Sequence, residues 1–169
     1  MRLLGLDPGL RATGWGIIDV RGNHLTFVAA GTIHSAAHQS LAARLSVIYS
    51  ELIAVIDSYK PDEAAVEETF LNRNPVSTLK LGQARGVVLL APAQAGLAVA
   101  EYAATTIKKA IVGTGHADKI QIQSMVSRLL PGALAHSPDA ADALAIAICH
   151  AHYAGSAQRT IAALKAEVR

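Results

Sequence analysis

The chain has 169 residues and a mass of 17.6 kDa, which is the size of one domain and excludes two full catalytic domains. Hydrophobic residues make up 51% of it and charged residues 17%, a composition that can bury a core and excludes global disorder. The net charge of +2 by itself indicates no class of partner, and the single cysteine, Cys149, excludes a disulfide scaffold and a four-thiolate zinc site.

The N-terminal segment is expected to be mature cytosolic sequence. Its apolar run, residues 3–6, is interrupted by Asp7 and Pro8 before it reaches the length of a signal peptide. The longest stretch without a charged side chain, residues 86–100, contains Pro92 and is shorter than the roughly 18 residues that a transmembrane helix requires. We therefore expect a cytoplasmic protein with no membrane anchor.

The N-terminal half of the chain is predicted to form three strands, one long helix and a fourth strand. The first strand ends at the turn sequence Asp7-Pro8-Gly9, and residues 21–23 form a hairpin turn between the next two, so the chain opens with an antiparallel meander. Apolar residues then recur every three or four positions up to Tyr59, with Ser40 as the helix cap. The expected strands are residues 3–6, 13–20, 24–33 and 64–66, and the expected helix is 40–59.

The C-terminal half is predicted to be mostly helical. Pro92 is expected to interrupt the first of its helices. Ser137 and Pro138 open the last helix, because serine caps helices and proline is tolerated at the first helical position. The expected elements are helices over residues 76–91, 105–112, 117–130 and 137–150, a strand over 97–102 and a loop over 70–75. Residues 1–155 are expected to form one domain and 156–169 a basic C-terminal tail.

The charges are unevenly distributed along the chain. Five acidic residues lie between positions 57 and 68, just before a segment, residues 72–119, in which six basic side chains outnumber two acidic ones. Acids beside basic surface suit a metal-dependent enzyme that acts on a polyanion, although ordinary surface charge explains the same pattern equally well. The basic side chains are Arg73, Lys80, Arg85, Lys108, Lys109 and Lys119.

Carboxylates from three separate segments occur at the ends of predicted elements. Asp7 follows the first strand, Glu67 ends the fourth, and Asp139 and Asp142 lie about one turn apart on the last helix. Taken singly, each has an ordinary explanation: turn chemistry, a solvated strand end that Glu68 would share, or complementation of a helix dipole. Together they attach carboxylates to core elements, which is costly unless they are paired or bind cations. Hard oxygen ligands without a cysteine or histidine pair favour Mg²⁺ or Mn²⁺, so the pattern predicts a two-metal phosphodiesterase site.

Five blocks of the sequence, in this order, closely resemble the bacterial RuvC family of Holliday-junction endonucleases. The blocks are Leu6-Asp7-Pro8-Gly9, Thr13-Gly14-Trp15-Gly16, Val66-Glu67 with Phe70, LKLGQARG at residues 79–86, and DAADALA at residues 139–145. They cover nearly the whole chain, from about residue 3 to residue 152. The resemblance implies an α/β protein of the RNase H-like fold, with a five-stranded mixed sheet whose first three strands are antiparallel, flanked by helices.

The same resemblance implies a homodimer that resolves four-way junction DNA, in recombination and repair, by symmetric nicks that leave 5′-phosphate ends. The implied cofactor is Mg²⁺, two ions per subunit with Mn²⁺ as a substitute, and the implied partner complex is the RuvA and RuvB branch-migration complex. The metal ligands carried over from the family are Asp7, Glu67, Asp139 and Asp142, and with Lys108 and Lys119 they form the expected catalytic set. The expected DNA-binding residues are Phe70, Arg73, Lys80, Arg85, Lys108 and Lys119. Leu10 and Arg73 depart from the family pattern, which affects the expected DNA contacts more than the chemistry.

Two other functions remain open at this point. A catalytically idle junction-binding module on the same fold is disfavoured by the intact acids. Half of a sugar-kinase or actin-like ATPase is disfavoured because no phosphate-binding glycine loop or second domain copy is present. The ring of Phe70 could stack on an unpaired base or pack against the long helix. Gly82 and Gly86 allow close approach of a second helix, from the same chain or from another subunit.

Overall fold

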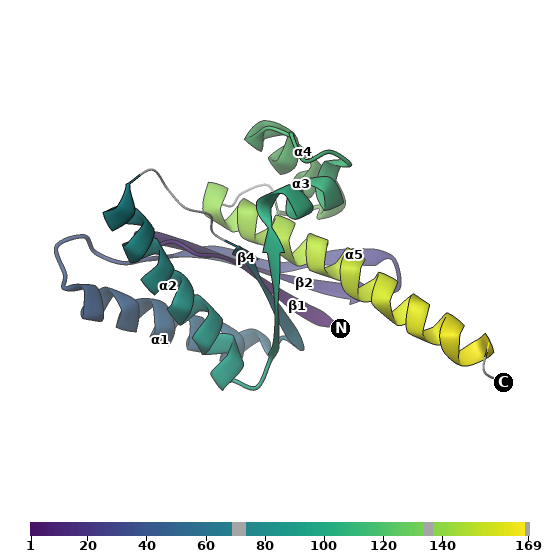
Figure 1. Cartoon of the computed structure of the whole chain (residues 1–169), viewed down its shortest axis with the longest axis horizontal. Helices are drawn as coiled ribbons and strands as arrows, with labels where there is room; N and C mark the ends of the chain where they lie inside the picture. The colour runs from purple at the N-terminus through teal and green to yellow at the C-terminus, as the bar shows by residue number, and fades with distance from the viewer. Residues whose placement is uncertain (69–73, 134–136, 168–169) are drawn as a thin grey trace.

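The computed structural model describes residues 1–68, 74–133 and 137–167, with side chains as far as residue 154. Helices cover both faces of a five-stranded sheet (Figure 1). The elements in chain order are β1 (Arg2–Asp7), β2 (Ala12–Arg21), β3 (His24–His34), α1 (Leu41–Tyr59), β4 (Glu63–Glu68), α2 (Pro75–Gln94), β5 (Ala98–Ala103), α3 (Ala104–Val112), α4 (Lys119–Leu129) and α5 (Pro138–Glu167).

The strands lie in the order β3-β2-β1-β4-β5. Strand β2 runs antiparallel to both β1 and β3, which confirms the predicted meander. Strands β4 and β5 then extend the sheet in parallel with β1. The carboxyl ends of β1 and β4 therefore meet at the same edge of the sheet, as the predicted RNase H-like arrangement requires.

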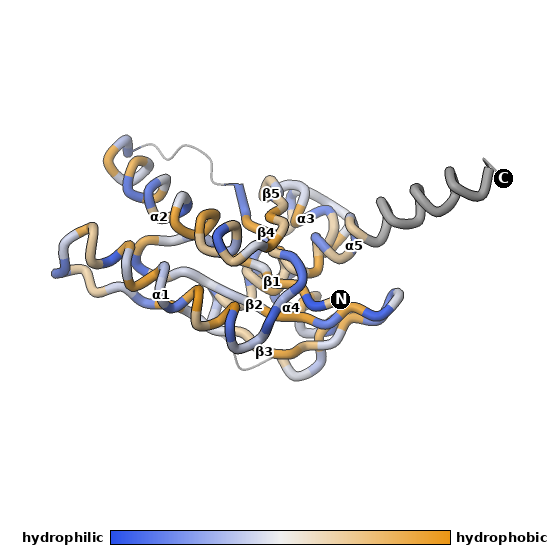
Figure 2. The backbone as a smooth tube through the Cα atoms, turned by 90° about the horizontal axis from the view of Figure 1, so that it is seen from below, coloured by the Kyte–Doolittle hydropathy of each residue, from blue (hydrophilic) through white to orange (hydrophobic). Residues whose placement is uncertain are grey.

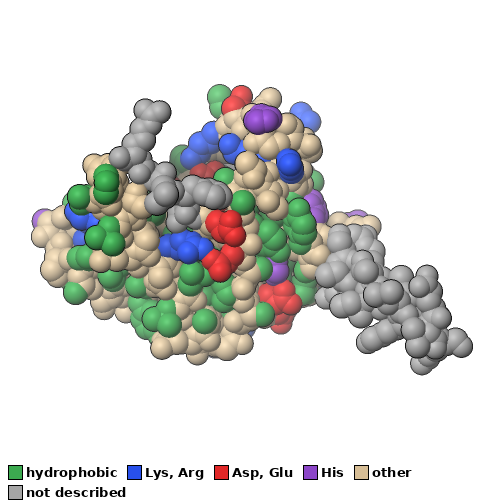
Figure 3. Space-filling model, viewed as in Figure 1, with side chains coloured by type: hydrophobic (Ala, Val, Ile, Leu, Met, Phe, Trp, Pro, Cys, Tyr) green, Lys and Arg blue, Asp and Glu red, His purple; other side chains and the backbone are tan. Residues whose placement is uncertain are grey.

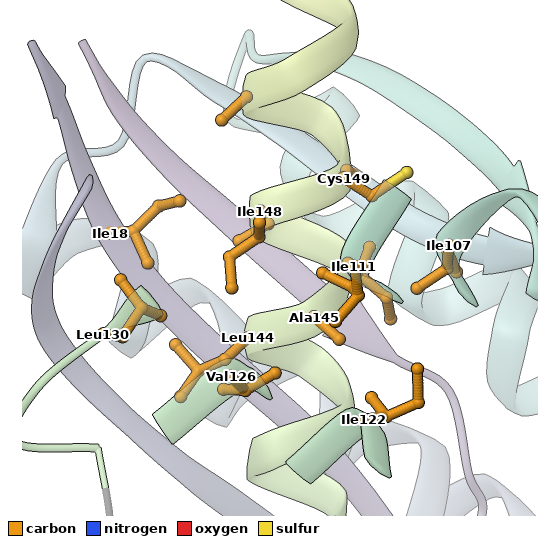
Figure 4. Packing of buried hydrophobic residues seen from close by; sticks show 14 of the residues in the cluster. Ile18, Ile107, Ile111, Ile122, Val126, Leu130, Leu144, Ala145, Ile148 and Cys149 are labelled. Carbon is orange, nitrogen blue, oxygen red and sulfur yellow. The ribbon is translucent and has the colours of Figure 1, made fainter. Parts of the chain in front are cut away.

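Alternate residues of β1 face two separate hydrophobic cores. Leu4 and Leu6 pack with α1 and α2, whose turns alternate between hydrophobic and hydrophilic residues in Figure 2. Leu3 belongs to the core beneath α3, α4 and α5, where Leu144 and Ile148 of α5 meet side chains from β2 and α4 (Figure 4). Because both faces are buried, β1 needs apolar side chains at successive positions, which explains its continuous apolar run.

Helix α5 packs unusually close to β1 and β2, and glycines make this possible. A Cβ atom placed at Gly5 would lie 2.0 Å from the carbonyl oxygen of Ala143, and one at Gly14 would lie 2.0 Å from that of Asp139. At Gly16 the nearest atoms belong to the side chain of Leu144. Any side chain at Gly5 or Gly14 would meet the helix backbone and push α5 away from the sheet.

Helix α2 contradicts one expectation, because it continues through Pro92 and ends at Gln94. Proline in a helix interior removes a hydrogen bond and clashes with the preceding turn, at a cost of about 3 kcal/mol or more. Pro92 lies in the last turn of α2, and it is buried together with Val88 and Ala91 of the same helix. Tertiary packing therefore outweighs the local preference against proline.

The other predicted elements are present. Most differ by a few residues at their ends, whereas α5 extends well past its predicted end at residue 150. Helix α4 begins at Lys119 because Asp118 caps it: the Asp118 carboxylate accepts from the backbone N–H of Gln121, and the Gln121 side chain accepts from that of Asp118. Helix α5 is continuous to Glu167, so the predicted tail begins as part of this helix, and the domain boundary at residue 155 stays a prediction. Within the described ranges, no helix has the length and hydropathy needed to cross a bilayer.

We expect Gly14→Ala to lower the free energy of unfolding by about 1 to 3 kcal/mol, the usual range for overpacking, because the added methyl group meets a backbone oxygen. Urea denaturation of the metal-free protein measures this loss. Gly16→Ala is the matched control, since its methyl group meets mainly the Leu144 side chain. In a double-mutant cycle, Leu144→Ala should reduce the destabilisation caused by Gly16→Ala and leave the destabilisation caused by Gly14→Ala unchanged. Equal coupling at both positions would contradict the backbone contact.

Candidate active site

Asp7 ends β1 in a row of residues that crosses three strands. In the antiparallel register Asp7 is paired with Gly14 of β2, and Gly14 is paired with Thr32 of β3. Side chains alternate along a strand, and Gly5 lies directly beneath α5, so Asp7 faces the α5 side of the sheet. The carbonyl oxygen of Asp139 lies over Gly14 in the same row. The first turn of α5 therefore sits beside the end of β1.

Two hydroxyl groups hold this first turn of α5 on the sheet. The Ser137 hydroxyl accepts a hydrogen bond from the backbone N–H of Ala140 at 3.2 Å, the contact expected of a helix cap. The same hydroxyl is hydrogen-bonded to that of Thr32 on β3. Because Thr32 belongs to the row that contains Asp7, the acidic end of α5 is tied to the strand ends.

Glu67 reaches the same edge of the sheet from β4. The last registered pair between β1 and β4 is Leu6 with Val66, so Asp7 and Glu67 are the next residues on the two strands. Ala65 lies in the core beneath α5, and by strand alternation Glu67 faces the same side. Glu67 lines a cavity of ≈ 270 Å³. The other residues that line this cavity are Ala104, Ile107, Lys108, Lys119, Ile122, Asp142 and Ala145.

Two lysines bring positive charge to the acids. The Nζ atom of Lys119, at the start of α4, lies 2.8 Å from Oδ2 of Asp142, and 55% of the Lys119 side chain is exposed. Lys108, on α3, lines the same cavity. Acidic and basic side chains gather in the hollow between α2 and the pair α3 and α4 (Figure 3). Because the Lys119–Asp142 pair is open to solvent, it contributes little stability and is easily exchanged.

Burial and mutual repulsion disfavour the charged forms of the acids at the strand ends. Burial, followed by the nearby carboxylates of Glu67, Asp142 and Asp139, raises the pKa of Asp7 to about 7. Burial first, then Asp142, raises the pKa of Glu67. The hydrogen bond to Asp142 raises the pKa of Lys119 and keeps it charged. The site thus carries more negative charge than its lysines neutralise, and a divalent cation would relieve this excess.

The donor set fits a hard divalent cation, because the converging groups are all carboxylates. As the side chains stand, no three acidic, histidine or cysteine side chains in the described part of the chain are close enough together to enclose an ion. Asp142 is held by Lys119 instead. For these acids to bind a metal, Asp142 would have to release the Lys119 ammonium group and the carboxylates would have to turn toward one another.

The structure brings together part of the predicted site. The residues that converge are Asp7, Glu67, Asp139, Asp142, Lys108 and Lys119. Lys80 is exposed on α2. Arg85 is bonded to Glu101 and to the backbone carbonyl of Glu67, so its guanidinium is already engaged. Phe70 and Arg73 lie outside the described residues.

Sequence reasoning identified Ser137 as a helix cap but missed Thr32. The two residues are separated by 105 positions, and no local pattern links a strand threonine to a distant helix cap. The only signal available in the sequence is a hydroxyl side chain next to Gly31 in the third strand. Pairing of β3 with β2 is what brings Thr32 to the site.

The fold and the converging acids are those of a metal-dependent nuclease of the RNase H-like class. Residues 3–150 match the family model described as crossover junction endodeoxyribonuclease RuvC. Proteins with that description from Rhodospirillum rubrum and Xanthobacter autotrophicus are 63% and 59% identical to this chain, over 93% and 97% of each chain respectively. The chain belongs to the RuvC family.

Solved structures agree with this assignment. RuvC of Thermus thermophilus in complex with a Holliday junction substrate superposes with a TM-score of 0.87 at 32% identity, covering 93% of this chain and 96% of that chain. The yeast mitochondrial Holliday junction resolvase, at 12% identity and a TM-score of 0.65, covers 88% of this chain and 77% of that chain and shares the fold. The predicted family and fold class are confirmed.

We expect Asp7→Asn to stabilise the metal-free protein at about pH 8. The pKa of Asp7 is raised from its ordinary value of 3.8 to about 7 in the folded state, so between these pH values the native state holds a proton that the unfolded chain has lost. The free energy of unfolding therefore falls as pH rises from about 4 to about 7. Asparagine has no carboxyl group to ionise, so this loss of stability at high pH does not occur in the variant. Urea denaturation in the presence of EDTA should show a clear gain at about pH 8 and a much smaller one at about pH 5.

Asp19→Asn is the control with the opposite sign. The hydrogen bond from Arg2 lowers the pKa of Asp19, so its charged form favours the folded state and its loss should destabilise the protein at about pH 8. A destabilised Asp7→Asn variant at that pH would contradict the repulsion inferred among the acids.

Proposed function

We propose that this protein is a structure-selective endonuclease that resolves Holliday junctions by paired, symmetric nicks in DNA recombination and repair. The observation that carries the proposal is the convergence of carboxylates from β1, β4 and α5. Two of them, Glu67 and Asp142, line one cavity together with Lys108 and Lys119. Membership of the RuvC family supports the reaction. The similarity to a RuvC structure that contains a Holliday junction substrate supports the choice of DNA.

The proposed cofactor is Mg²⁺, two ions per subunit, with Mn²⁺ as a substitute. The residues that would hold the ions are Asp7, Glu67, Asp139 and Asp142. When bound, such ions supply a water of lowered pKa and stabilise charge that develops on the scissile phosphate. Asp7 would lose its proton as the cation arrives, because the pKa raised by burial and by the other carboxylates falls beside a positive ion.

The lysines are proposed to act on the DNA phosphate. If Asp142 held a cation, the ammonium group of Lys119 would be released and could contact a phosphate at the mouth of the cavity. Lys108 would face the same phosphate from α3 and stabilise negative charge in the transition state. Phe70, Arg73 and Lys80 remain the predicted contacts to the rest of the junction.

A homodimer is proposed because one active site cuts one strand, whereas resolution needs two matching cuts. The outer face of α2 is a suitable interface: Val76, Leu79 and Leu90 are 61%, 65% and 48% exposed. Apart from its chain neighbours and the backbone of its own helix, a Cβ atom at Gly82 or Gly86 would meet no described atom within 4 Å. The helix that these glycines can admit would therefore come from a second subunit. On the family relationship alone, we also infer docking to the RuvA and RuvB complex.

Replacement of single acids should separate cleavage from binding. We expect Asp7→Asn, Glu67→Gln, Asp139→Asn and Asp142→Asn each to reduce nicking of a synthetic four-way junction in Mg²⁺ on the order of a hundredfold or more. Binding measured by gel shift in Ca²⁺ should remain, because metal ligands and not phosphate contacts are removed. Asp57→Asn, at an exposed acid of α1, is the control and should cleave normally. Near-normal nicking by the Asp7 or Glu67 variant would refute the proposed site.

The dimer is tested by one charge on the outer face of α2. Leu79→Asp should give a monomer by light scattering at micromolar concentration, because a carboxylate cannot be buried unpaired in an apolar interface. Ile120→Asp, at an even more exposed apolar residue of α4, should stay dimeric. A monomeric wild-type protein, or a dimeric Leu79→Asp variant, would contradict this interface.

A further inference from the structure

The guanidinium group of Arg85 links three elements behind the proposed active site. Arg85 lies on α2, on the side of the sheet opposite α5. Its Nε atom donates a hydrogen bond to the carbonyl oxygen of Glu67 at 3.4 Å, and its Nη2 atom is bonded to the carboxylate of Glu101 on β5. Only 23% of the Arg85 side chain is exposed, so the guanidinium is turned toward the protein.

This contact falls where β4 loses one of its two neighbouring strands. The registered pairing of β4 with β1 ends at Val66, whereas the pairing with β5 continues to Glu68. At Glu67 the registered pairing of β4 is therefore with β5 alone. Glu101 is the register partner of Val66, so it anchors the guanidinium at the level where the support from β1 ends.

We propose that Arg85, oriented by Glu101, is a positioning residue that holds the backbone of Glu67 so that its carboxylate faces the other acids. The inference rests on the proposed function, because it takes Glu67 to be a metal ligand. This role differs from the phosphate contact that the sequence predicts for Arg85. A guanidinium group that is hydrogen-bonded to a carboxylate and a backbone carbonyl does not contact DNA.

The test measures metal binding without DNA, by calorimetric titration of the full-length protein with Mn²⁺. Arg85→Met and Glu101→Gln should each weaken Mn²⁺ binding by about tenfold, the lower end of the range for residues that support a metal ligand. Arg85→Lys keeps a charge beside Glu101 but lacks the Nε donor, so it should fold and still bind Mn²⁺ less tightly. Wild-type Mn²⁺ affinity in Arg85→Lys would overturn the proposal.

Arg2→Met is the matched control for a purely structural effect. The Arg2 guanidinium also bonds a carboxylate, Asp19, and a backbone carbonyl, that of Tyr59, but it lies at the opposite end of β1 from Asp7. Its replacement should lower the free energy of unfolding and leave Mn²⁺ affinity unchanged. An equal loss of Mn²⁺ affinity in Arg2→Met would mean that general destabilisation explains the Arg85 result.

Two further measurements identify the route of the effect. In a Glu67→Gln background, Arg85→Met should cause no additional loss of Mn²⁺ affinity, because both changes act through one ligand. Junction binding by Arg85→Met should keep the wild-type salt dependence, whereas a slope lowered by about one ion would show a phosphate contact and overturn the proposal. If Glu67→Gln alone leaves Mn²⁺ binding unchanged, the proposed metal site itself fails, and this inference fails with it.

Discussion

The close contact between α5 and the glycines of β1 and β2 is the constraint on which the rest of the site depends. With Gly5 and Gly14 beneath it, the backbone of α5 lies almost directly on the sheet. The helix carries two of the acids and the strand end carries a third, so the separation of the carboxylates is set by backbone contact. Such contact does not yield to side-chain motion, which makes it a firm support for groups that repel one another.

Both ends of the α5 segment that covers the sheet are also held by polar contacts. Near its start, Thr32 holds the cap residue Ser137. Further along, the buried ring of His150 is bonded to Glu63 of β4 and to Tyr102 of β5, each at 2.8 Å. The helix is thereby tied to both edges of the sheet, β3 on one side and β5 on the other, and it cannot rotate without breaking part-buried hydrogen bonds.

The electrostatics of the site follow from this rigid support. Carboxylates held near one another and partly buried cannot all ionise at low cost, which raises the pKa of Asp7. Lys119 offsets part of the charge, but it does so at an exposed pair that is easily exchanged. The carboxylates at the strand ends therefore carry negative charge that the lysines do not fully neutralise. A bound cation would neutralise the remainder, and Lys119, which faces solvent, could then contact a phosphate.

The sequence by itself determined the strand order of the opening meander and the helix caps at Ser40 and Ser137, because turns and caps are local properties of the chain. Motif spacing also singled out the four acids that the structure brings near one another. It could not determine the path of α2 through Pro92, where packing outweighs a local preference. Nor could it assign Arg85, whose partners lie on strands β4 and β5. Those contacts join residues far apart in the chain, so only the tertiary structure decides which charged side chains are paired within the protein and which are exposed to solvent.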